Sequence, residues 1–118
     1  MTVSATCHCG AVRLTLPAPP AEVTDCNCSI CRRLGVLWAY YDPMEVAGPR
    51  PGLTDSYTWD DRAIAFHRCP VCGCATHWSP ITAPRTRMGV NARLLDPELL
   101  ERARVRRLDG AGTERYVD

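Results

Sequence analysis

Closely spaced cysteines most constrain the fold of this chain of 118 residues, which contains eight of them. Seven fall into three short groups with CxC, CxCxxC and CxxC spacing: Cys7 and Cys9; Cys26, Cys28 and Cys31; Cys69 and Cys72. Thiols this close together converge readily on one metal ion, whereas disulfides between them would close strained turns. The spacing therefore favours metal-binding knuckles over disulfides.

The start of the sequence lacks the basic segment and apolar run of a secretory signal. Clustered cysteines in a secreted chain indicate disulfides, but in a cytoplasmic protein they are more typical of metal ligands or catalytic groups. We therefore expect a cytoplasmic protein whose cysteines bind Zn²⁺. Disulfides and another metal group, such as an iron–sulfur cluster, are the alternatives.

The bulk composition bounds the size and the partners of the protein. A length of 118 residues fits one domain, residues 1–118. A domain this small buries a modest core and often needs a metal to stabilise it. The net charge is +1, and no segment approaches the about 20 apolar residues of a membrane helix. We thus expect neither nucleic acid nor a membrane as a partner.

The CxC and CxxC pairs come from distant parts of the chain and together supply four thiolates. These four are Cys7, Cys9, Cys69 and Cys72. A site with four protein ligands is typical of structural zinc, and in small peptides it contributes about 10–16 kcal/mol of folding free energy. We predict that this site ties the N-terminal hairpin to the C-terminal half of the chain.

The CxCxxC run supplies only three thiolates, from Cys26, Cys28 and Cys31. Three protein ligands are typical of a catalytic zinc, which keeps one position open for water or substrate. An external thiol bound there would lose its proton near neutral pH and could attack an electrophile. The neighbouring Arg32 and Arg33 could balance the negative charge of such a site, or they could be a solvated surface pair.

The eighth cysteine leaves an alternative open. Cys74 could complete a second closed four-thiolate site, and no open position would then remain. Against this, Cys74 follows Cys72 on a strand already committed to the first site, and a lone cysteine among apolar neighbours is more often a small buried hydrophobe. The three histidines, His8, His67 and His77, are further candidates for a fourth ligand.

Short alternating and β-branched runs fill the rest of the sequence and predict an all-β domain with very little helix. The predicted strands cover residues 2–6, 11–16, 23–25, 36–41, 44–47, 53–59, 63–68, 74–79, 86–94 and 105–108. We expect one helical turn over residues 30–34, with Ser29 as its N-cap, and a short helix over residues 98–103 that begins at Asp96 and Pro97. Residues 109–118 are expected to form a partly mobile tail.

Several aromatic residues could wall a pocket, although packing in the core explains most of them equally well. They are Trp38, Tyr40, Tyr41, Trp59 and Trp78. Tyrosine and tryptophan residues on the predicted edge strands also suggest a homodimer, because large aromatic side chains are enriched at protein interfaces.

Three segments of the sequence resemble one known family. They are residues 7–13 (CHCGAVR), 26–33 (CNCSICRR) and 66–73 (FHRCPVCG). Together they resemble the glutathione-dependent formaldehyde-activating enzyme family, which also includes the centromere protein V type domains. The resemblance runs from about residue 5 to about residue 95, and this span is the expected core. Asn27 departs from the family pattern, in which this position is often His.

The resemblance implies a β-tent fold of small antiparallel sheets with zinc knuckles. It also implies a structural zinc on the CxC and CxxC pairs and a second zinc on the CxCxxC run, the same partition that the spacing favours. The activity that it implies joins glutathione and formaldehyde to S-(hydroxymethyl)glutathione, which is a carbon–sulfur lyase reaction written in reverse. Membership of a fold family alone does not fix a function.

Our leading hypothesis is a zinc-dependent enzyme of the carbon–sulfur lyase type that acts on a thiol–aldehyde adduct. Cys26, Cys28 and Cys31 would hold its catalytic zinc, Arg32 would balance the charge, and a small thiol such as glutathione would be the partner. The alternative is a zinc-stabilised interaction module without catalysis, whose candidate surface is the Arg-dense stretch of residues 102–107. Redox sensing through the open thiolates is a third hypothesis.

Overall fold

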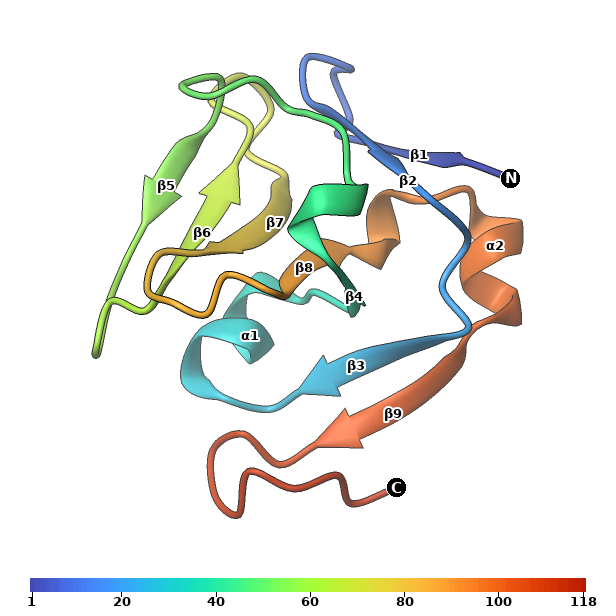
Figure 1. Ribbon diagram of the computed structural model, residues 1–118. Coiled ribbons are helices and arrows are strands. Elements are labelled where there is room, and N and C mark those ends of the chain that lie inside the picture. Colours follow the sequence, from blue (N-terminus) through green and yellow to red (C-terminus); the bar gives the residue numbers. More distant parts are fainter.

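The computed structural model describes residues 1–118, which form mostly β-strands (Figure 1). In chain order, the elements are β1 (Val3–Thr6), β2 (Arg13–Leu16), β3 (Glu22–Cys26), α1 (Ser29–Leu34), β4 (Trp38–Tyr41), the 3₁₀ helix η1 (Pro43–Glu45), β5 (Asp55–Tyr57), β6 (Ile64–Arg68), β7 (Ala75–Pro80), β8 (Met88–Asn91), the 3₁₀ helix η2 (Ala92–Leu94), α2 (Pro97–Arg102) and β9 (Arg104–Leu108). The predicted all-β class with very little helix is confirmed. None of the helices has the length and apolar character needed to cross a membrane.

The strands form two open sheets. β1 and β2 pair only with each other, as an antiparallel hairpin. The other seven strands form one sheet in the order β5-β6-β7-β8-β4-β3-β9. Figure 1 shows the β1–β2 hairpin at one side of the molecule and β5, β6 and β7 at the other. The two unclosed sheets agree with the β-tent that the resemblance implies, with one addition: β3 and β9 run parallel.

The β2 strand shows why the hairpin packs against the rest of the molecule. Leu14 and Leu16 are fully buried, as is Val12 just before the strand, whereas Arg13 between them is exposed. This alternation gives the hairpin one apolar face, which must be covered by another element. Gly10 has a φ of 84° in the turn between the two strands, a value that favours glycine.

The buried apolar side chains form two clusters, and each contains cysteines of one group. The larger cluster has 13 buried residues, including Cys7 and Cys69. The smaller cluster consists of Cys26, Cys31, Val36, Trp38 and Phe66. Each group of thiols is therefore embedded in its own part of the core, where burial makes an uncompensated thiolate charge costly.

Both Asp-Pro pairs of the chain begin a helix, although the sequence analysis expected this of only one. The carboxylate of the aspartate accepts the backbone N–H two residues further on, at 3.0 Å for Asp96 and at 2.9 Å for Asp42. The helix start at Asp96 is thus confirmed. The predicted strand over residues 44–47 is wrong, because η1 occupies its first half and only Ala47 forms an isolated bridge with a strand.

The start of α1 also differs from the prediction. The N-cap is Cys28, which has an extended backbone and no capping side-chain hydrogen bond, and Ser29 is the first helical residue. The predicted Ser29 cap is therefore wrong, because Cys28 takes the position before the helix and directs its sulfur to the neighbouring thiols. Gly35 ends the helix, with a φ of 68° and its N–H bonded to the carbonyl of Cys31 at 3.0 Å.

Several strands are shorter than predicted. β8 ends at Asn91 rather than at residue 94, because the Asn91 side chain accepts the Arg93 N–H at 3.2 Å and begins η2. Of the strand predicted over residues 53–59, only Asp55–Tyr57 pairs, at the exposed edge of the sheet. These differences shorten the strands without changing their order along the chain.

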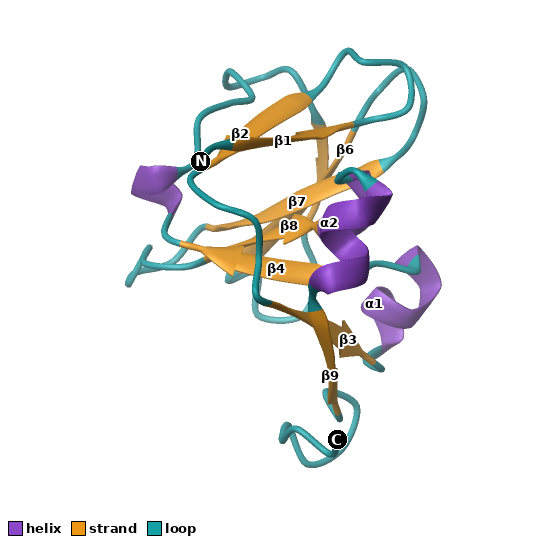
Figure 2. Cartoon of the chain, turned by 90° about the vertical axis from the view of Figure 1, so that its right-hand side faces the viewer, coloured by secondary structure: helices purple, strands orange, loops and turns teal.

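Residues 109–118 turn back below β3 and β9 (Figures 1 and 2). The Val117 N–H donates to the carbonyl of Arg107 at 2.9 Å. The Asp118 carboxylate accepts from Arg104 and from Arg106, each at 3.2 Å. The mobility expected of this segment stays a prediction, which hydrogen exchange at its amides can test.

Candidate metal centres and cavity

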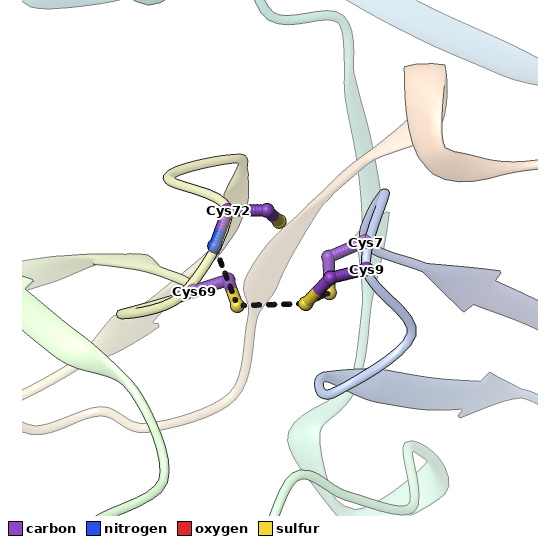
Figure 3. A group of neighbouring side chains, drawn as sticks. All are labelled: Cys7, Cys9, Cys69 and Cys72. Carbon is purple, nitrogen blue, oxygen red and sulfur yellow. Dashed lines mark hydrogen bonds between the residues drawn. The ribbon is translucent and has the colours of Figure 1, made fainter.

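The structure brings Cys7, Cys9, Cys69 and Cys72 together, with their sulfur atoms within 4.8 Å of one another. We call this group the four-cysteine cluster. Figure 3 shows the thiols of the N-terminal turn facing those of the knuckle between β6 and β7. The sulfur of Cys9 lies 3.7 Å from that of Cys7 and 3.6 Å from that of Cys69. Two parts of the chain separated by about 60 residues thus meet through their thiols.

The four-cysteine cluster fits a tetrahedral zinc ion. Four sulfurs bound tetrahedrally at the usual zinc–sulfur distance of about 2.3 Å lie about 3.8 Å apart, close to the 3.6 and 3.7 Å observed. Backbone N–H groups also point at the sulfurs, from Val12 to Cys7 at 3.2 Å and from Val71 to Cys69 at 3.4 Å. Such donors stabilise thiolates and orient them toward a cation.

The ionisation of these thiols is uneven, as expected for like charges crowded together. Backbone N–H groups of Cys74 and Cys9 lower the pKa of the Cys72 thiol to about 5. The pKa of the Cys7 thiol is lowered overall. Burial acts to raise it, but the hydrogen bonds from the backbone N–H of Val12 and from neighbouring thiols outweigh burial. The pKa of the Cys9 thiol is raised to about 11. A backbone N–H acts to lower it, but burial and the adjacent sulfurs outweigh that hydrogen bond. A bound cation would relieve this crowding.

Cys26, Cys28 and Cys31 also meet, with their sulfur atoms within 4.8 Å of one another. We call this group the three-cysteine cluster. It is built where β3 ends and α1 begins, so that the three thiols share one turn. The indole N–H of the buried Trp38 donates to the Cys31 sulfur at 3.2 Å, and the Cys28 N–H donates to the Cys26 sulfur at 3.5 Å. N–H donors that point at the sulfurs are typical of metal–thiolate sites, so the cluster fits a metal ion.

Burial dominates the ionisation of the three-cysteine cluster. It raises the pKa of the Cys31 thiol, and the Trp38 N–H offsets this only in part. Burial likewise raises the pKa of Cys26. It opposes ionisation of Cys28 too, but the N–H groups of Cys31 and Ile30 outweigh it and lower the pKa of that thiol. Three thiolates therefore need a cation beside them to coexist here.

The other candidate ligands lie outside the three-cysteine cluster. Cys74 packs against the larger core cluster, which contains Cys7 and Cys69, and belongs to neither group of converging thiols. His8 is exposed and also lies outside both groups. The structure thus brings three thiols to this cluster, and it does not bring Cys74 to them as a fourth.

His67 and His77 stack on each other across β6 and β7, with ring centres 4.1 Å apart and planes 2° apart. The His67 ring nitrogens lie 2.8 Å from the hydroxyl of Thr54 and 2.7 Å from that of Ser79. Burial lowers the pKa of His67, and burial together with the nearby His67 lowers the pKa of His77 to about 3. The pair is a neutral, hydrogen-bonded part of the sheet rather than a set of metal ligands.

A cavity of about 250 Å³ opens beside the three-cysteine cluster, and all three of its cysteines line it. None of the four cysteines of the other cluster lines a cavity. The two clusters therefore differ in access as well as in ligand number. The four-cysteine cluster can hold an ion with four protein ligands and no open position. The three-cysteine cluster instead faces a space in which a small molecule fits.

Five aromatic residues line this cavity, beside the three cysteines, two isoleucines and two aspartates. The aromatic residues are Trp38, Tyr40, Trp59, Phe66 and Trp78. Sequence analysis named four of them and missed Phe66, which shares one face of β6 with Ile64, another lining residue. Tyr41 was also named but lies elsewhere, because its hydroxyl donates to the carbonyl of Ala18 at 2.9 Å and its ring packs on the larger core cluster.

The charged residues of the lining are acidic. Asp60 and Asp61 lie in the turn before β6 and were not recognised as site residues in the sequence. Asp60 has a φ of 54°, an uncommon value for a residue other than glycine and one that aspartate tolerates better than most. Arg32 is exposed on α1 and does not line the cavity, and the Arg33 guanidinium donates to the carbonyl of Ser29 at 2.8 Å. The charge-balancing role of Arg32 stays a prediction.

Comparison with known proteins finds a matching family model and similar solved structures. The family model described as glutathione-dependent formaldehyde-activating enzyme matches residues 2–106. A crystal structure of a Rhodobacter sphaeroides protein is similar, with a TM-score of 0.69 and 28% identity over 86% of this chain and 98% of that chain. No curated protein matches the sequence.

Proposed function

The chain belongs to the glutathione-dependent formaldehyde-activating enzyme family, and we propose that it is a zinc-dependent enzyme of the carbon–sulfur lyase type that acts on a thiol–aldehyde adduct. The observation that carries this proposal is the position of the three-cysteine cluster in the wall of a cavity of about 250 Å³. A cluster of three thiols that faces a cavity leaves room for a substrate atom beside a metal, which a closed structural site does not.

Each cluster has its own role in this proposal. Cys7, Cys9, Cys69 and Cys72 hold a structural zinc, and Cys26, Cys28 and Cys31 hold the catalytic one. A zinc ion bound in the three-cysteine cluster would favour the deprotonated form of a thiol beside it. Trp38 fixes the direction of the Cys31 sulfur through its indole N–H, and that ring and its aromatic neighbours give the cavity an apolar lining.

The proposed reaction moves one proton and forms one bond between carbon and sulfur. The thiol sulfur adds to the aldehyde carbon, the carbonyl becomes a hydroxyl group, and the proton passes from the sulfur to that oxygen. Nothing is oxidised or reduced, and the reverse reaction releases the aldehyde. Asp60 and Asp61 line the cavity and are the carboxylates able to carry this proton. The positive φ of Asp60 supports a functional role for this turn.

The substrate is a small thiol, with glutathione the candidate that the family description supplies. Formaldehyde fits the aldehyde side because a one-carbon carbonyl leaves most of the cavity to the thiol. Thiols kept free for metal binding need a reducing compartment, which supports a cytoplasmic location. A homodimer stays part of the proposal, with Tyr57 half-exposed on the edge strand β5 as its candidate contact.

The alternative of an interaction module has less support. The Arg-dense stretch that would serve as its surface includes β9, where Arg104 and Arg106 both bind the Asp118 carboxylate. Arg106 also lies over the Tyr116 ring, 3.9 Å from its centre. These arginines therefore stabilise the C-terminal segment of the chain itself, which leaves less charge free for a partner.

A native mass spectrum under reducing conditions tests the proposal. The wild-type protein should carry two zinc ions and, when glutathione is added, one glutathione. Cys28→Ser should carry one zinc and no glutathione, because only the three-cysteine cluster is changed. Two zinc ions with no adduct, for glutathione or for smaller thiols, would contradict an open site.

A further inference from the structure

The end of β9 and the loop that follows it lie against the three-cysteine cluster. We propose that residues 108–112, here called the C-terminal loop, form one wall of the second metal centre, with Asn27 and Gly110 as positioning residues for Cys26 and Cys28. The metal role of these cysteines rests on the proposed function. That the loop covers Cys26 and Cys28 rests only on the contacts between the loop and these residues.

Asn27 links the two segments with both its backbone and its side chain. Its backbone N–H donates to the carbonyl of Leu108 at 3.2 Å. Its side-chain amide donates to the Asp109 carboxylate at 2.9 Å and accepts the N–H of Ala111 at 3.0 Å. Three hydrogen bonds thus converge on the residue between Cys26 and Cys28, so the loop holds the middle of the CxCxxC run in place.

Gly110 brings the loop backbone directly onto the thiols. A Cβ atom added at this position would lie 2.6 Å from the Cys26 sulfur and 3.3 Å from the Cβ of Cys28. A carbon and a sulfur cannot approach so closely, so a side chain here would displace the sulfur or the loop. The space between the loop backbone and the Cys26 sulfur therefore accommodates only glycine at position 110. The loop backbone closes this side of the three-cysteine cluster.

Other contacts hold the loop in this position. The Asp109 carboxylate accepts from both the N–H and the hydroxyl of Thr113, at 3.0 and 3.1 Å. Leu108 packs against the smaller core cluster, which contains Cys26. The Tyr116 hydroxyl lies 2.8 Å from that of Thr24 on β3. The loop is therefore anchored on both sides of Gly110.

The arrangement gives the three-cysteine cluster a closed side and an open side. Aromatic residues and carboxylates border the cavity, while the C-terminal loop covers Cys26 and Cys28 at Gly110. The loop lies beyond residue 106, where the family-model match ends. Residues outside that match therefore hold the CxCxxC run in place and cover one side of the three-cysteine cluster.

Two single variants test the cover, Gly110→Ala and Asn27→Ala, with Ala111→Gly as the matched control in the same loop. We expect both variants to bind the second zinc at least about tenfold more weakly in competition with a chelator, while the first zinc and the control keep wild-type affinity. In metal-free protein, we expect Cys26 to be alkylated faster in Gly110→Ala than in the wild type, as read by mass spectrometry of the labelled peptides.

A double variant separates positioning from a general loss of stability. Asn27→Asp alone removes the donor to Asp109 and places two carboxylates together, so it should weaken the second zinc. The double variant Asn27→Asp/Asp109→Asn exchanges the two side chains. It restores a donor facing an acceptor between these positions and should recover the affinity.

Wild-type zinc affinity together with a wild-type alkylation rate of Cys26 in Gly110→Ala would overturn the proposal. If the wild-type protein itself binds a single zinc, the proposed function fails, yet the alkylation rate still decides whether the loop covers Cys26.

Discussion

At the scale of single residues, local spacing predicted which thiols meet but not what surrounds them. The partition of seven cysteines into four and three follows from CxC, CxxC and CxCxxC spacing, since ligands close in sequence share one turn. Asp60, Phe66 and Gly110 could not be placed in the same way. They reach the three-cysteine cluster through the pairing of distant strands, which leaves no local signal.

Gly89 is a further residue whose role only the structure reveals. It pairs with Trp78 across β7 and β8, and an added Cβ would lie 2.1 Å from the Trp78 indole nitrogen. The indole therefore lies across the glycine, where it forms part of the cavity wall. A glycine in a strand often marks such a close approach, but sequence alone does not say what approaches it.

The two carboxylates of the cavity should select among thiols by charge. Glutathione carries two carboxylates against one ammonium group and is a net anion, so Asp60 and Asp61 disfavour its binding, whereas they attract the cationic cysteamine. We expect the double variant Asp60→Asn/Asp61→Asn to lower KM for glutathione and raise KM for cysteamine. Asparagine keeps the oxygen that accepts the Ala63 N–H at 3.0 Å and tolerates the positive φ of Asp60.

Steady-state kinetics with both thiols, at low and at high salt, checks this selection by charge. Parallel changes of KM for the two thiols would contradict it. A fall in kcat that is equal for both thiols would report the loss of a proton carrier instead, because that step does not depend on the charge of the thiol.

The buried His77 should make stability depend on pH. Burial lowers its pKa to about 3 in the folded protein, against the ordinary value of 6.5. Below pH 6.5 the unfolded chain binds a proton that the folded protein does not, so stability is complete above this pH and falls as the pH decreases toward about 3. Between pH 7.5 and 5.5 the loss should be about 1.4 kcal/mol.

Denaturant unfolding of the zinc-loaded protein across this range, compared with His77→Phe, measures this loss. The phenyl ring keeps the stacking on His67 and has no proton to gain, so the variant should show a smaller decrease. Zinc content is measured at each pH, so that loss of metal is not mistaken for titration. Equal slopes for the two proteins would refute the assignment.

At the scale of elements, the alternation of apolar and polar residues, together with turn residues, predicted most strands. It did not predict which strands pair with each other. β2 follows from its apolar alternation, and α2 follows from Asp96 and Pro97. The same Asp-Pro signal at residues 42–43 begins η1, a helix that is not among those predicted from the sequence. The parallel pairing of β3 with β9 could not be predicted, because it depends on where residues 17–21 and 95–103 direct the chain.

The two clusters should contribute very differently to folding. Cys69 joins the β6–β7 knuckle to the N-terminal turn through the sulfur of Cys9, 3.6 Å away. A structural zinc there contributes about 10–16 kcal/mol, as much as the stability of a whole domain. We expect Cys69→Ser to be insoluble or to melt without cooperativity, and Cys28→Ser to melt cooperatively with one zinc bound.

Circular dichroism melting and zinc analysis of the two variants check this difference. Cys74→Ser is the control, since Cys74 belongs to neither cluster and this variant should keep both zinc ions. A soluble Cys69→Ser protein that melts cooperatively would show that the four-cysteine cluster does not hold the fold together.

At the scale of the whole molecule, the fold keeps two groups of thiols apart and gives them different surroundings. The radius of gyration is 13.5 Å, close to the about 13.5 Å expected of a compact chain of this length. Within it, the four-cysteine cluster joins the hairpin to the large sheet, and the three-cysteine cluster faces the cavity. That residues 1–118 unfold as one domain stays a prediction, and a single transition for all spectroscopic probes would support it.

The central claim is that the three-cysteine cluster promotes the addition of a thiol to an aldehyde. The most direct measurement is the exchange rate between ¹³C-formaldehyde and its thiol adduct, observed by NMR with zinc-loaded protein. The wild type should accelerate the exchange, and Cys28→Ser, which keeps the structural zinc, should leave the uncatalysed rate unchanged. Equal rates with the two proteins, or no acceleration by wild type carrying two zinc ions, would contradict the claim.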